Sequence, residues 1–316
     1  MRRVVWLLAF CLAAAAAQAD TYPTKPIRAI VPFPAGSATD GMARLVSAHF
    51  TKVFGHGLVI ENMVGATGTI ASRATAKAPP DGYTIMFSTN STHSANAYLY
   101  NNLGYDPIGD FTPLALLSRA PHAMVVRADA SYPAFRDFVA FAKANPGKLN
   151  FGYGNTGSLA GGAMLNSYAG IKTAQVSYRG TPQVTTDLLG GQINVGLDFM
   201  STYIPLVNDG KLRALAVTSS ERAPSLPGVM TVQEAGFKGF EATAWYAIVA
   251  PAGTPADAIQ KVNAVTNGYL NSPKGKAQLE VFAMQASGGT PDDLKAYIKT
   301  ELEKWAPIIR AAKIEM

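Results

Sequence analysis

The residues best suited to bind a ligand lie where an apolar segment ends and a helical pattern begins. Ser37 and Asp40 have the spacing of a capping box, in which the hydroxyl and the carboxylate each bond an otherwise unpaired backbone N–H. They follow the apolar run Ile27 to Val31 and the proline-pinned loop Pro32 to Gly36. A strand, a rigid loop and a helix start direct free amides and the positive end of a helix dipole at an anion. This stretch therefore predicts an anion-binding site.

A glycine-rich segment forms a second candidate site. Three glycines of segment 152–157 match G-x-G-x-x-G after a predicted strand and before a predicted helix, as in a dinucleotide site. The next strand ends at Arg179 instead of an acidic residue for a ribose. Three interpretations remain: an NADP site, a tight turn that permits close helix packing, and a second anion-binding helix start. We favour the third, to which Thr156 and Ser158 add hydroxyl donors, because a bare glycine match is weak.

No set of side chains has the spacing of a catalytic or metal site. Ser158 only loosely resembles a nucleophile elbow, because Thr156 stands where G-x-S-x-G has its first glycine. Asp40 has the place of a general base, but a first-turn carboxylate is more often a cap. The four histidines show no metal-ligand spacing. We therefore predict a binding protein that is no enzyme and has no metal or other cofactor.

The N-terminus has the pattern of an export signal. Arg2 and Arg3 form a positive region, residues 4–17 are uncharged and largely apolar, and Ala17-Gln18-Ala19 fits a small-x-small cleavage site. The apolar run is shorter than the roughly 20 residues that span a bilayer. We expect residues 1–19 to be a signal peptide cleaved after Ala19, so that the mature protein is exported.

Composition limits the remaining classes. The only cysteine of the 316 residues, Cys11, lies in the predicted signal, so the mature chain has no disulfide. The formal charge of +6 falls to +4 without Arg2 and Arg3, and the lysines and arginines are spread along the chain. A nucleic-acid-binding protein would be expected to cluster them. We predict no nucleic-acid partner.

Strand-like and helix-like runs alternate along the chain. The pattern predicts an α/β fold with mainly parallel sheets flanked by helices. A long terminal helix is expected from near Pro291 to near Ala311, because Leu294, Ile298, Leu302 and Trp305 are spaced by three or four residues. The strand-like runs are Ile27 to Val31, Leu58 to Glu61, Tyr83 to Phe87, Met124 to Arg127, Leu149 to Phe151, Gln175 to Tyr178, Asn194 to Leu197, Leu212 to Thr218 and Tyr246 to Ala250.

No flexible linker divides the chain, although its length favours two domains. We therefore expect extended segments near 119–124 and 243–249 to cross between the domains. This predicts a first lobe of residues 20–120 plus 247–316 and a second lobe of residues 121–246.

Several motifs, in the same order, resemble the Bug (TctC-type) family of extracytoplasmic solute-binding proteins of tripartite tricarboxylate transporters. The resemblance covers essentially the whole mature chain. The motifs are Tyr22-Pro23-x-Lys25-Pro26-Ile27-Arg28, Val31-Pro32-Phe33-Pro34 with Asp40, Val59-Ile60-Glu61-Asn62, Ala78-Pro79-Pro80-Asp81-Gly82-Tyr83-Thr84, Tyr105-Asp106-Pro107, Ala144-Asn145-Pro146-Gly147-Lys148-Leu149-Asn150, Asp187-Leu188-Leu189-Gly190-Gly191-Gln192, Gly210-Lys211-Leu212-Arg213-Ala214-Leu215-Ala216-Val217-Thr218 and Ala250-Pro251-Ala252-Gly253-Thr254-Pro255.

The resemblance implies a two-lobed, type II-like periplasmic binding protein that is a monomer, with a ligand cleft between its lobes. Its ligand would be a small carboxylate or dicarboxylate, delivered to integral membrane permease subunits. The carboxylate would be held by Phe33 to Ala38 and by Thr156 to Ser158. Ser37 replaces a glycine frequent in the family, and Leu159 to Gly162 lack a frequent histidine; both departures bear on ligand preference.

Further candidates complete the predicted binding set. Ser88, Thr89 and Asn90 follow a strand, at the end where α/β sheets place ligands, or form a polar turn. Asp198 ends another strand and either faces the pocket or caps the next helix. Tyr153 and Trp245 either cover the ligand or pack in the core, and Arg179 is either a carboxylate fork or a surface residue. The full predicted set is Phe33, Gly36, Ser37, Ala38, Ser88, Thr89, Asn90, Tyr153, Thr156, Gly157, Ser158 and Asp198.

Two other functions remain open. A sensor component would use the same pocket but present its ligand to a membrane receptor. A periplasmic enzyme would need a base beside Ser158 in space. The partner and product formation, respectively, distinguish these from a transport receptor.

Overall fold

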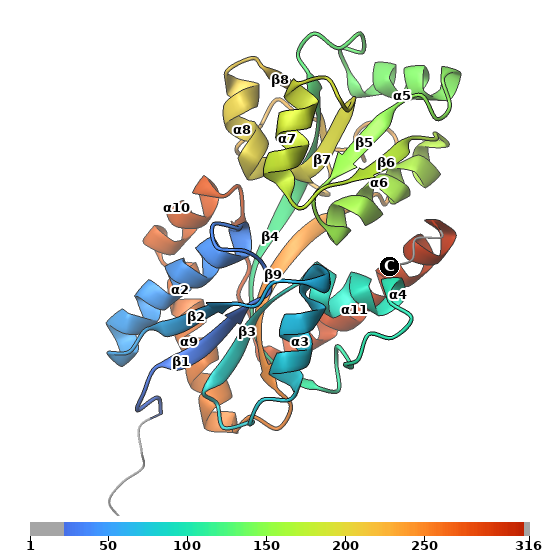
Figure 1. Cartoon of the computed structure of the whole chain (residues 1–316). Helices are drawn as coiled ribbons and strands as arrows, with labels where there is room; N and C mark the ends of the chain where they lie inside the picture. The colour runs from blue at the N-terminus through green and yellow to red at the C-terminus, as the bar shows by residue number, and fades with distance from the viewer. Residues whose placement is uncertain (1–21, 313–316) are drawn as a thin grey trace, which may run out of the picture.

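Two β-sheets that share the long strand β4 organise the chain (Figure 1). The computed structural model describes residues 22–312, so the predicted signal peptide 1–19 and its cleavage site lie outside the described residues. We call the part built on β1–β3 the first lobe, and the part built on β5–β8 the second lobe. None of the helices between residues 22 and 312 combines the length and apolar character needed to cross a bilayer.

The first lobe contains a parallel sheet with an antiparallel extension. β1 lies between β2 and β3 and is parallel to both, whereas β9 pairs antiparallel with β3. The short β10 pairs antiparallel with β4. The strands are β1 (Ile27–Val31), β2 (Leu58–Asn62), β3 (Thr84–Thr89), β4 (Phe111–Arg127), β9 (Thr243–Pro251) and β10 (Gln285–Ala286).

The second lobe repeats this design. β5 is parallel to both β6 and β7, and β4 pairs antiparallel with β7 on one side and with β8 on the other. The strands are β5 (Asn150–Tyr153), β6 (Ala174–Ser177), β7 (Val195–Phe199) and β8 (Leu212–Val217). The predicted α/β class with two lobes is confirmed. The predicted parallel arrangement holds within β1–β3 and within β5–β7, whereas every pairing of β4, β8, β9 and β10 is antiparallel.

β4 belongs to both sheets. Residues 111–121 pair with β9, and residues 122–127 pair with β7 and β8. The sequence predicted only the last part of this strand, because Pro113 and Pro121 cannot donate to a ladder. Both are accommodated, and register shifts occur between Pro113 and Ala115 and between Leu116 and Ser118. The crossing at Pro121 adjoins the predicted lobe boundary, and the division into lobes stays a prediction.

Helices cover both faces of the sheets (Figure 1). Most have an apolar face; in α2, for example, Met42, Val46 and Phe50 are buried against the first sheet. The α-helices are α2 (Ala38–Phe54), α3 (Thr69–Ala76), α4 (Asn96–Leu99), α5 (Phe135–Ala144), α6 (Thr156–Ala169), α7 (Thr181–Leu189), α8 (Met200–Asn208), α9 (Ala256–Asn271), α10 (Pro273–Val281) and α11 (Pro291–Ala312); the shorter helical turns are η2 (Ala66–Gly68) and the π-helix η3 (Ser91–Ala95).

The predicted terminal helix is present as α11, and it contacts both lobes. Leu294 packs with Trp245 and other residues of the shared strands, whereas Trp305 belongs to the core of the second lobe. Between them, the buried carboxylate of Glu301 accepts hydrogen bonds from Trp245 Nε1 at 3.1 Å and from Trp305 Nε1 at 2.9 Å. Trp245 is therefore a core residue and not the ligand cover that was one of its two predicted roles.

Candidate ligand-binding site

A cavity of about 680 Å³ lies between the lobes. Its walls come mainly from the loops and helix starts that follow the carboxyl ends of the parallel strands, where α/β sheets place their ligands. The lining residues are Phe33, Pro34, Ala35, Gly36, Ser37, Ala38, Thr39, Thr89, Asn90, Ser91, Gly154, Asn155, Arg179, Gly180, Thr181, Pro182, Gln183, Phe199, Ser201, Thr202, Tyr246, Val281 and Phe282.

The start of α2 forms the wall contributed by the first lobe. Ser37 is the N-cap, and its hydroxyl accepts from Asp40 N at 3.3 Å. The Asp40 carboxylate accepts from Gly36 N at 2.9 Å and not, as predicted, from the N-cap amide, because Ser37 N donates to Pro34 O. The cap therefore closes one residue earlier and leaves the Ala38 and Thr39 amides without an intrahelical acceptor.

Asp40 is held tightly in this arrangement. Its carboxylate also receives two hydrogen bonds from Arg44, at 2.9 and 3.1 Å, and one from Asn62 Nδ2 at 3.1 Å. Burial acts to raise the pKa of Asp40, but the hydrogen bonds from Arg44, Gly36 and Asn62 outweigh it and lower the pKa. Asp40 stays ionised and shapes the loop, and its hydrogen bonds leave it no role as a base.

The start of α6 forms the facing wall in the second lobe. Asn155 is the N-cap, and its Oδ1 accepts from Ser158 N at 2.9 Å. Its Nδ2 donates to Ser158 Oγ at 2.8 Å. This cap leaves the amides of Thr156 and Gly157 without an intrahelical acceptor, beside the cavity. The predicted second anion-binding helix start thus has the geometry that such a site requires.

Asp198 lies beneath this wall. It is fully buried, and it accepts from Gly154 N at 2.8 Å, from Asn155 Nδ2 at 2.6 Å and from Phe199 N at 2.8 Å. Burial raises the pKa of Asp198 to about 6, although the hydrogen bonds from Phe199 N and Gly154 N act to lower it. The carboxylate fixes the turn and the cap that present the α6 amides. Asp198 does not itself line the cavity.

Two further helices begin at the cavity. The N-caps of α7 and α8, Gly180 and Phe199, provide no side-chain cap to the amides that follow. Thr181 to Gln183 and Ser201 to Thr202, in these first turns, line the cavity. Four helix starts, those of α2, α6, α7 and α8, therefore present positive dipole ends and free amides to one space.

The two lobes touch at Asn90 and Gly157. A Cβ atom placed on Gly157 would lie 2.3 Å from Asn90 Nδ2, which is far inside van der Waals contact. Asn90 follows β3 in the first lobe, and Gly157 is in the first turn of α6. Glycine is therefore required here for the close approach, and the contact brings hydrogen-bond donors of both lobes together.

The electrostatics of the cavity favour an anion. Arg179 is the one charged residue among those that line it. Within the described part of the chain, Arg179 takes part in no ion pair. No lining carboxylate opposes a bound anion, because Asp40 and Asp198 lie behind the wall and are occupied by hydrogen bonds.

The structure divides the predicted binding residues into two groups. Those that line the cavity are Phe33, Gly36, Ser37, Ala38, Thr89 and Asn90, and those outside its lining are Ser88, Tyr153, Thr156, Gly157, Ser158 and Asp198. Of the second group, Thr156 and Gly157 are in the first turn of α6, directly after the lining residue Asn155. Ser88 is fully buried and bonds His93 Nδ1 at 2.8 Å. Tyr153 stacks on Phe151 beside the core.

Sequence reasoning missed several lining residues. Tyr246, Phe199 and Phe282 lie in apolar stretches that look like core. We considered Trp245 as a residue that covers the ligand, but its neighbour Tyr246 lines the cavity instead. Adjacent residues of a strand face opposite sides of the sheet, so only one of the two can face the cavity. Asn155 had a usable signal, because Asn-x-x-Ser before an apolar run is a pattern for a helix cap.

The glycines of segment 152–157 are explained by close packing. A Cβ on Gly154 would lie 2.4 Å from Gly180 C, and one on Gly152 would lie 2.4 Å from Ile193 Cδ1. The β5–α6 turn thus abuts the β6–α7 turn directly. These contacts account for the glycine pattern without a dinucleotide.

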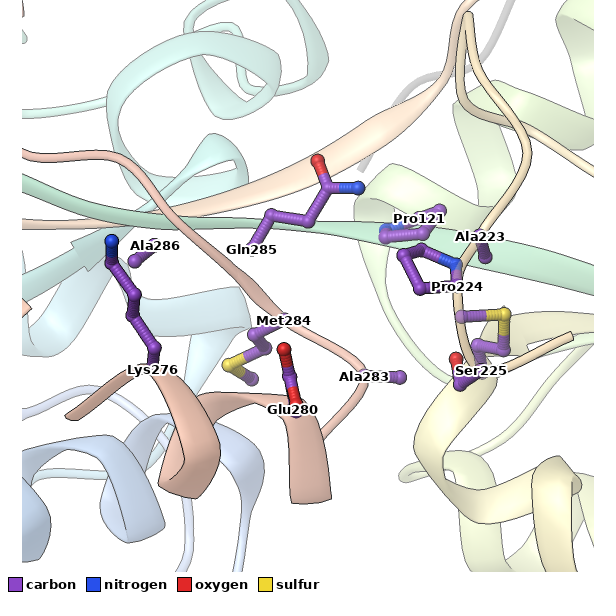
Figure 2. Close-up of a pocket in the computed structure, with 11 residues that line it drawn as sticks. Pro121, Ala223, Pro224, Ser225, Lys276, Glu280, Ala283, Met284, Gln285 and Ala286 are labelled. Atoms are coloured by element: carbon purple, nitrogen blue, oxygen red, sulfur yellow. The ribbon is translucent and has the colours of Figure 1, made fainter. Parts of the chain in front are cut away.

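A second cavity, of about 410 Å³, also lies between the lobes. Figure 2 shows Lys276 and Glu280 extending from α10 on one side, and Pro224 and Ser225 of a second-lobe loop on the other. Residues 281–282 line the first cavity and residues 283–286 line the second. The segment between α10 and β10 therefore separates the two spaces. Among residues 22–312, no group of three or more His, Cys, Asp or Glu is placed to hold a metal ion.

Comparison with known proteins gives one consistent result. A family model described as the tripartite tricarboxylate transporter family receptor matches residues 42–314. BugT of Bordetella pertussis is 34% identical over 305 residues, 94% of this chain and 92% of BugT. The structure "R. palustris Rpa4515 with adipate" has a TM-score of 0.87 and 31% identity, covering 93% of this chain and 99% of that chain.

Two further solved structures agree. MatC from Rhodopseudomonas palustris with bound malate has a TM-score of 0.82 and 31% identity, over 91% of this chain and 100% of that chain. The periplasmic binding protein BugD has a TM-score of 0.83 and 32% identity, over 93% of this chain and 99% of that chain. With a match that spans residues 42–314, this chain belongs to the TctC family of tripartite tricarboxylate transporter receptors.

Proposed function

We propose that this chain is a periplasmic receptor that captures a small carboxylate between its lobes and delivers it to the integral membrane permease of a tripartite transporter. One observation carries the proposal: a cavity lined by four helix starts contains a single charged lining residue, Arg179. Backbone amides and a guanidinium are the donors that proteins use to bind carboxylates. The similar structures of Rpa4515 with adipate and of MatC with bound malate both contain carboxylates.

The mechanism is a shift between open and closed lobes. A ligand favours the closed state only through contacts that it makes there and not in the open state. The amides of Ala38 and Thr39 belong to the first lobe, and those of Thr156 and Gly157 to the second. An anion shared by both pairs stabilises closure, and the closed form is the one that we expect the permease to recognise.

The finer assignments are part of the same proposal. They comprise the predicted binding residues, cleavage after Ala19, a monomeric state, and lobes of residues 20–120 plus 247–316 and 121–246. The crossing of β4 between sheets at Pro121 supports the division.

The test is direct binding by the mature chain, residues 20–316. Native mass spectrometry first identifies any co-purified molecule, which is then removed by partial unfolding and refolding. Calorimetry follows with citrate, the C4 to C6 dicarboxylates, aromatic dicarboxylates and acidic amino acids. Dimethyl esters of the same acids are the controls, because they keep the size and remove the charge. At least one acid should bind and its ester should not; binding of the ester with equal affinity, or silence across the panel, contradicts the proposal.

Delivery needs a separate measurement. Uptake of the labelled acid is compared in cells that carry the permease with and without this receptor. Uptake that does not depend on the receptor contradicts the transport role, and leaves a sensor role for the same pocket.

A further inference from the structure

Three buried polar groups on the floor of the ligand cavity have no hydrogen-bond partner within residues 22–312. They are Thr89 Oγ1, Asn90 Nδ2 and the phenolic oxygen of Tyr246. The residues are only 4%, 3% and 1% exposed, and all three line the cavity. We call these three residues the floor cluster.

The floor cluster is contiguous. Thr89 and Tyr246 are direct partners in the antiparallel pairing of β3 with β9, so their side chains lie on one face with Cβ atoms about 5 Å apart. Asn90 follows Thr89 at the end of the strand, and its Nδ2 packs against Gly157 of α6. The cluster therefore lies where the first lobe meets the first turn of α6.

Missing partners and a place in the cavity lining together distinguish this cluster from the other buried polar groups of residues 22–312. Most buried polar side chains in proteins are hydrogen-bonded, and each exception calls for a bound group or a water. The neighbouring Ser88, Thr92 and Ser94 all have hydrogen bonds. His93 Nε2 of η3 and Thr156 Oγ1 of α6 also lack a partner, but neither residue lines the cavity. Among the unpartnered side-chain groups of residues 22–312, only those of the floor cluster belong to lining residues.

We propose that the floor cluster is a subsite for a hydroxyl group, so that this receptor prefers a hydroxycarboxylate to the same acid without the hydroxyl. This inference rests on the proposed function. The carboxylate of such a ligand is bound by the helix amides, which only donate. The cluster instead offers one amide donor and two hydroxyls that both donate and accept, which is the complement of a ligand hydroxyl. A methylene at this place leaves all three groups unpaired.

The test compares matched acids: malate with succinate, 2-hydroxyglutarate with glutarate, and citrate with tricarballylate. A site built to bond a hydroxyl discriminates strongly against the analogue that lacks it. We expect the hydroxy acid to bind at least about tenfold more tightly in at least one pair. The double variant Thr89→Val and Tyr246→Phe should reduce that preference to below about threefold, because the hydroxy acid loses the partners of its hydroxyl group.

The matched control is Tyr203→Phe. Tyr203 also has a buried hydroxyl without a partner in the described chain, but it does not line the cavity. This variant should keep the wild-type preference. Thermal melting of each variant shows that it is folded.

The outcomes separate the two proposals. Equal binding within all three pairs overturns the hydroxyl subsite and leaves carboxylate capture standing. A preference that survives the double variant also overturns it, because the cluster then bonds water and not the ligand. If no carboxylate of the wider panel binds, both proposals are wrong.

Discussion

Replacing Asp198 with asparagine tests whether a buried carboxylate underpins the α6 wall. Both carboxylate oxygens of Asp198 accept from N–H groups, those of Gly154, Asn155 and Phe199. An asparagine has one oxygen and one NH₂, so its NH₂ group must face at least one of these donors. We therefore expect Asp198→Asn to loosen the Asn155 cap and to weaken carboxylate binding about tenfold, the worth of roughly one hydrogen bond.

The same variant has a signature in the pH dependence of stability. Burial raises the pKa of Asp198 from 3.8 to about 6 in the folded protein, which corresponds to about 3 kcal/mol. Because the folded state holds this proton more tightly than the unfolded state, the stabilisation is fully present only well below pH 3.8 and is lost as the pH rises through about 6. In Asp198→Asn this contribution is absent at every pH.

The assay is urea unfolding of both proteins at half-unit steps from pH 4 to 7.5. The difference in unfolding free energy, wild type minus variant, cancels the other titrating groups. It should fall by about 2.4 kcal/mol over this range, mostly before pH 6.5, since about 0.6 kcal/mol of the total is already lost at pH 4. A difference that stays constant within about 0.5 kcal/mol would refute the claim that Asp198 ionises in a buried site.

Three other substitutions test separate parts of the structure. Gly157→Ala places a Cβ 2.3 Å from Asn90 Nδ2, so it should obstruct closure and lower the calorimetric affinity for a carboxylate at least about tenfold. Arg179→Gln removes the one charged lining residue; losing a charged hydrogen bond of about 1.5–3 kcal/mol lowers calorimetric affinity roughly tenfold to hundredfold. Trp245→Phe removes a donor to buried Glu301 and should lower the free energy of urea unfolding by at least about 1.5 kcal/mol, with carboxylate affinity unchanged.

The first two of these substitutions have matched controls. Gly161→Ala adds a methyl to the same helix, where the nearest atoms are 3.2 and 3.3 Å away in the core, and should leave the affinity unchanged. Arg136→Gln removes an exposed arginine on α5, away from the cavity. Equal losses in variant and control would mean that the effect is general and not local to the site. For Trp245→Phe, a lowered affinity would contradict its assignment to the core.

The local elements of the fold could be predicted from sequence because their signals are local. The cap at Ser37, the terminal helix and most strands depend on residues a few positions apart. The long strand β4 could not be predicted in full, because its prolines are tolerated only through pairing shifts with distant β9. Its dual membership of both sheets is a property of tertiary structure.

The candidate site shows the same limit. The α2 start was predicted from its capping pattern and the α6 start from its glycine-rich loop, and the two helix caps, Ser37 and Asn155, both line the cavity. The starts of α7 and α8 were not predicted as anion-binding sites, because their N-cap residues, Gly180 and Phe199, carry no capping side chain. Tyr246 was missed because its environment is apolar and only the opposite lobe turns that strand position into a cavity floor.

Movement of the lobes could be followed with a fluorescent dye attached at the second cavity, which Figure 2 shows. Phe199 and Val281 face one space while their neighbours Met200 and Ala283 face the other, so rotation that narrows the first cavity changes the second. Because Cys11 is the only cysteine and lies in the predicted signal, Ser225→Cys gives the mature chain a single thiol on the rim of that second space. An environment-sensitive dye attached there would change emission on closure without contacting the ligand, and the receptor would become a sensor for whichever acid it captures.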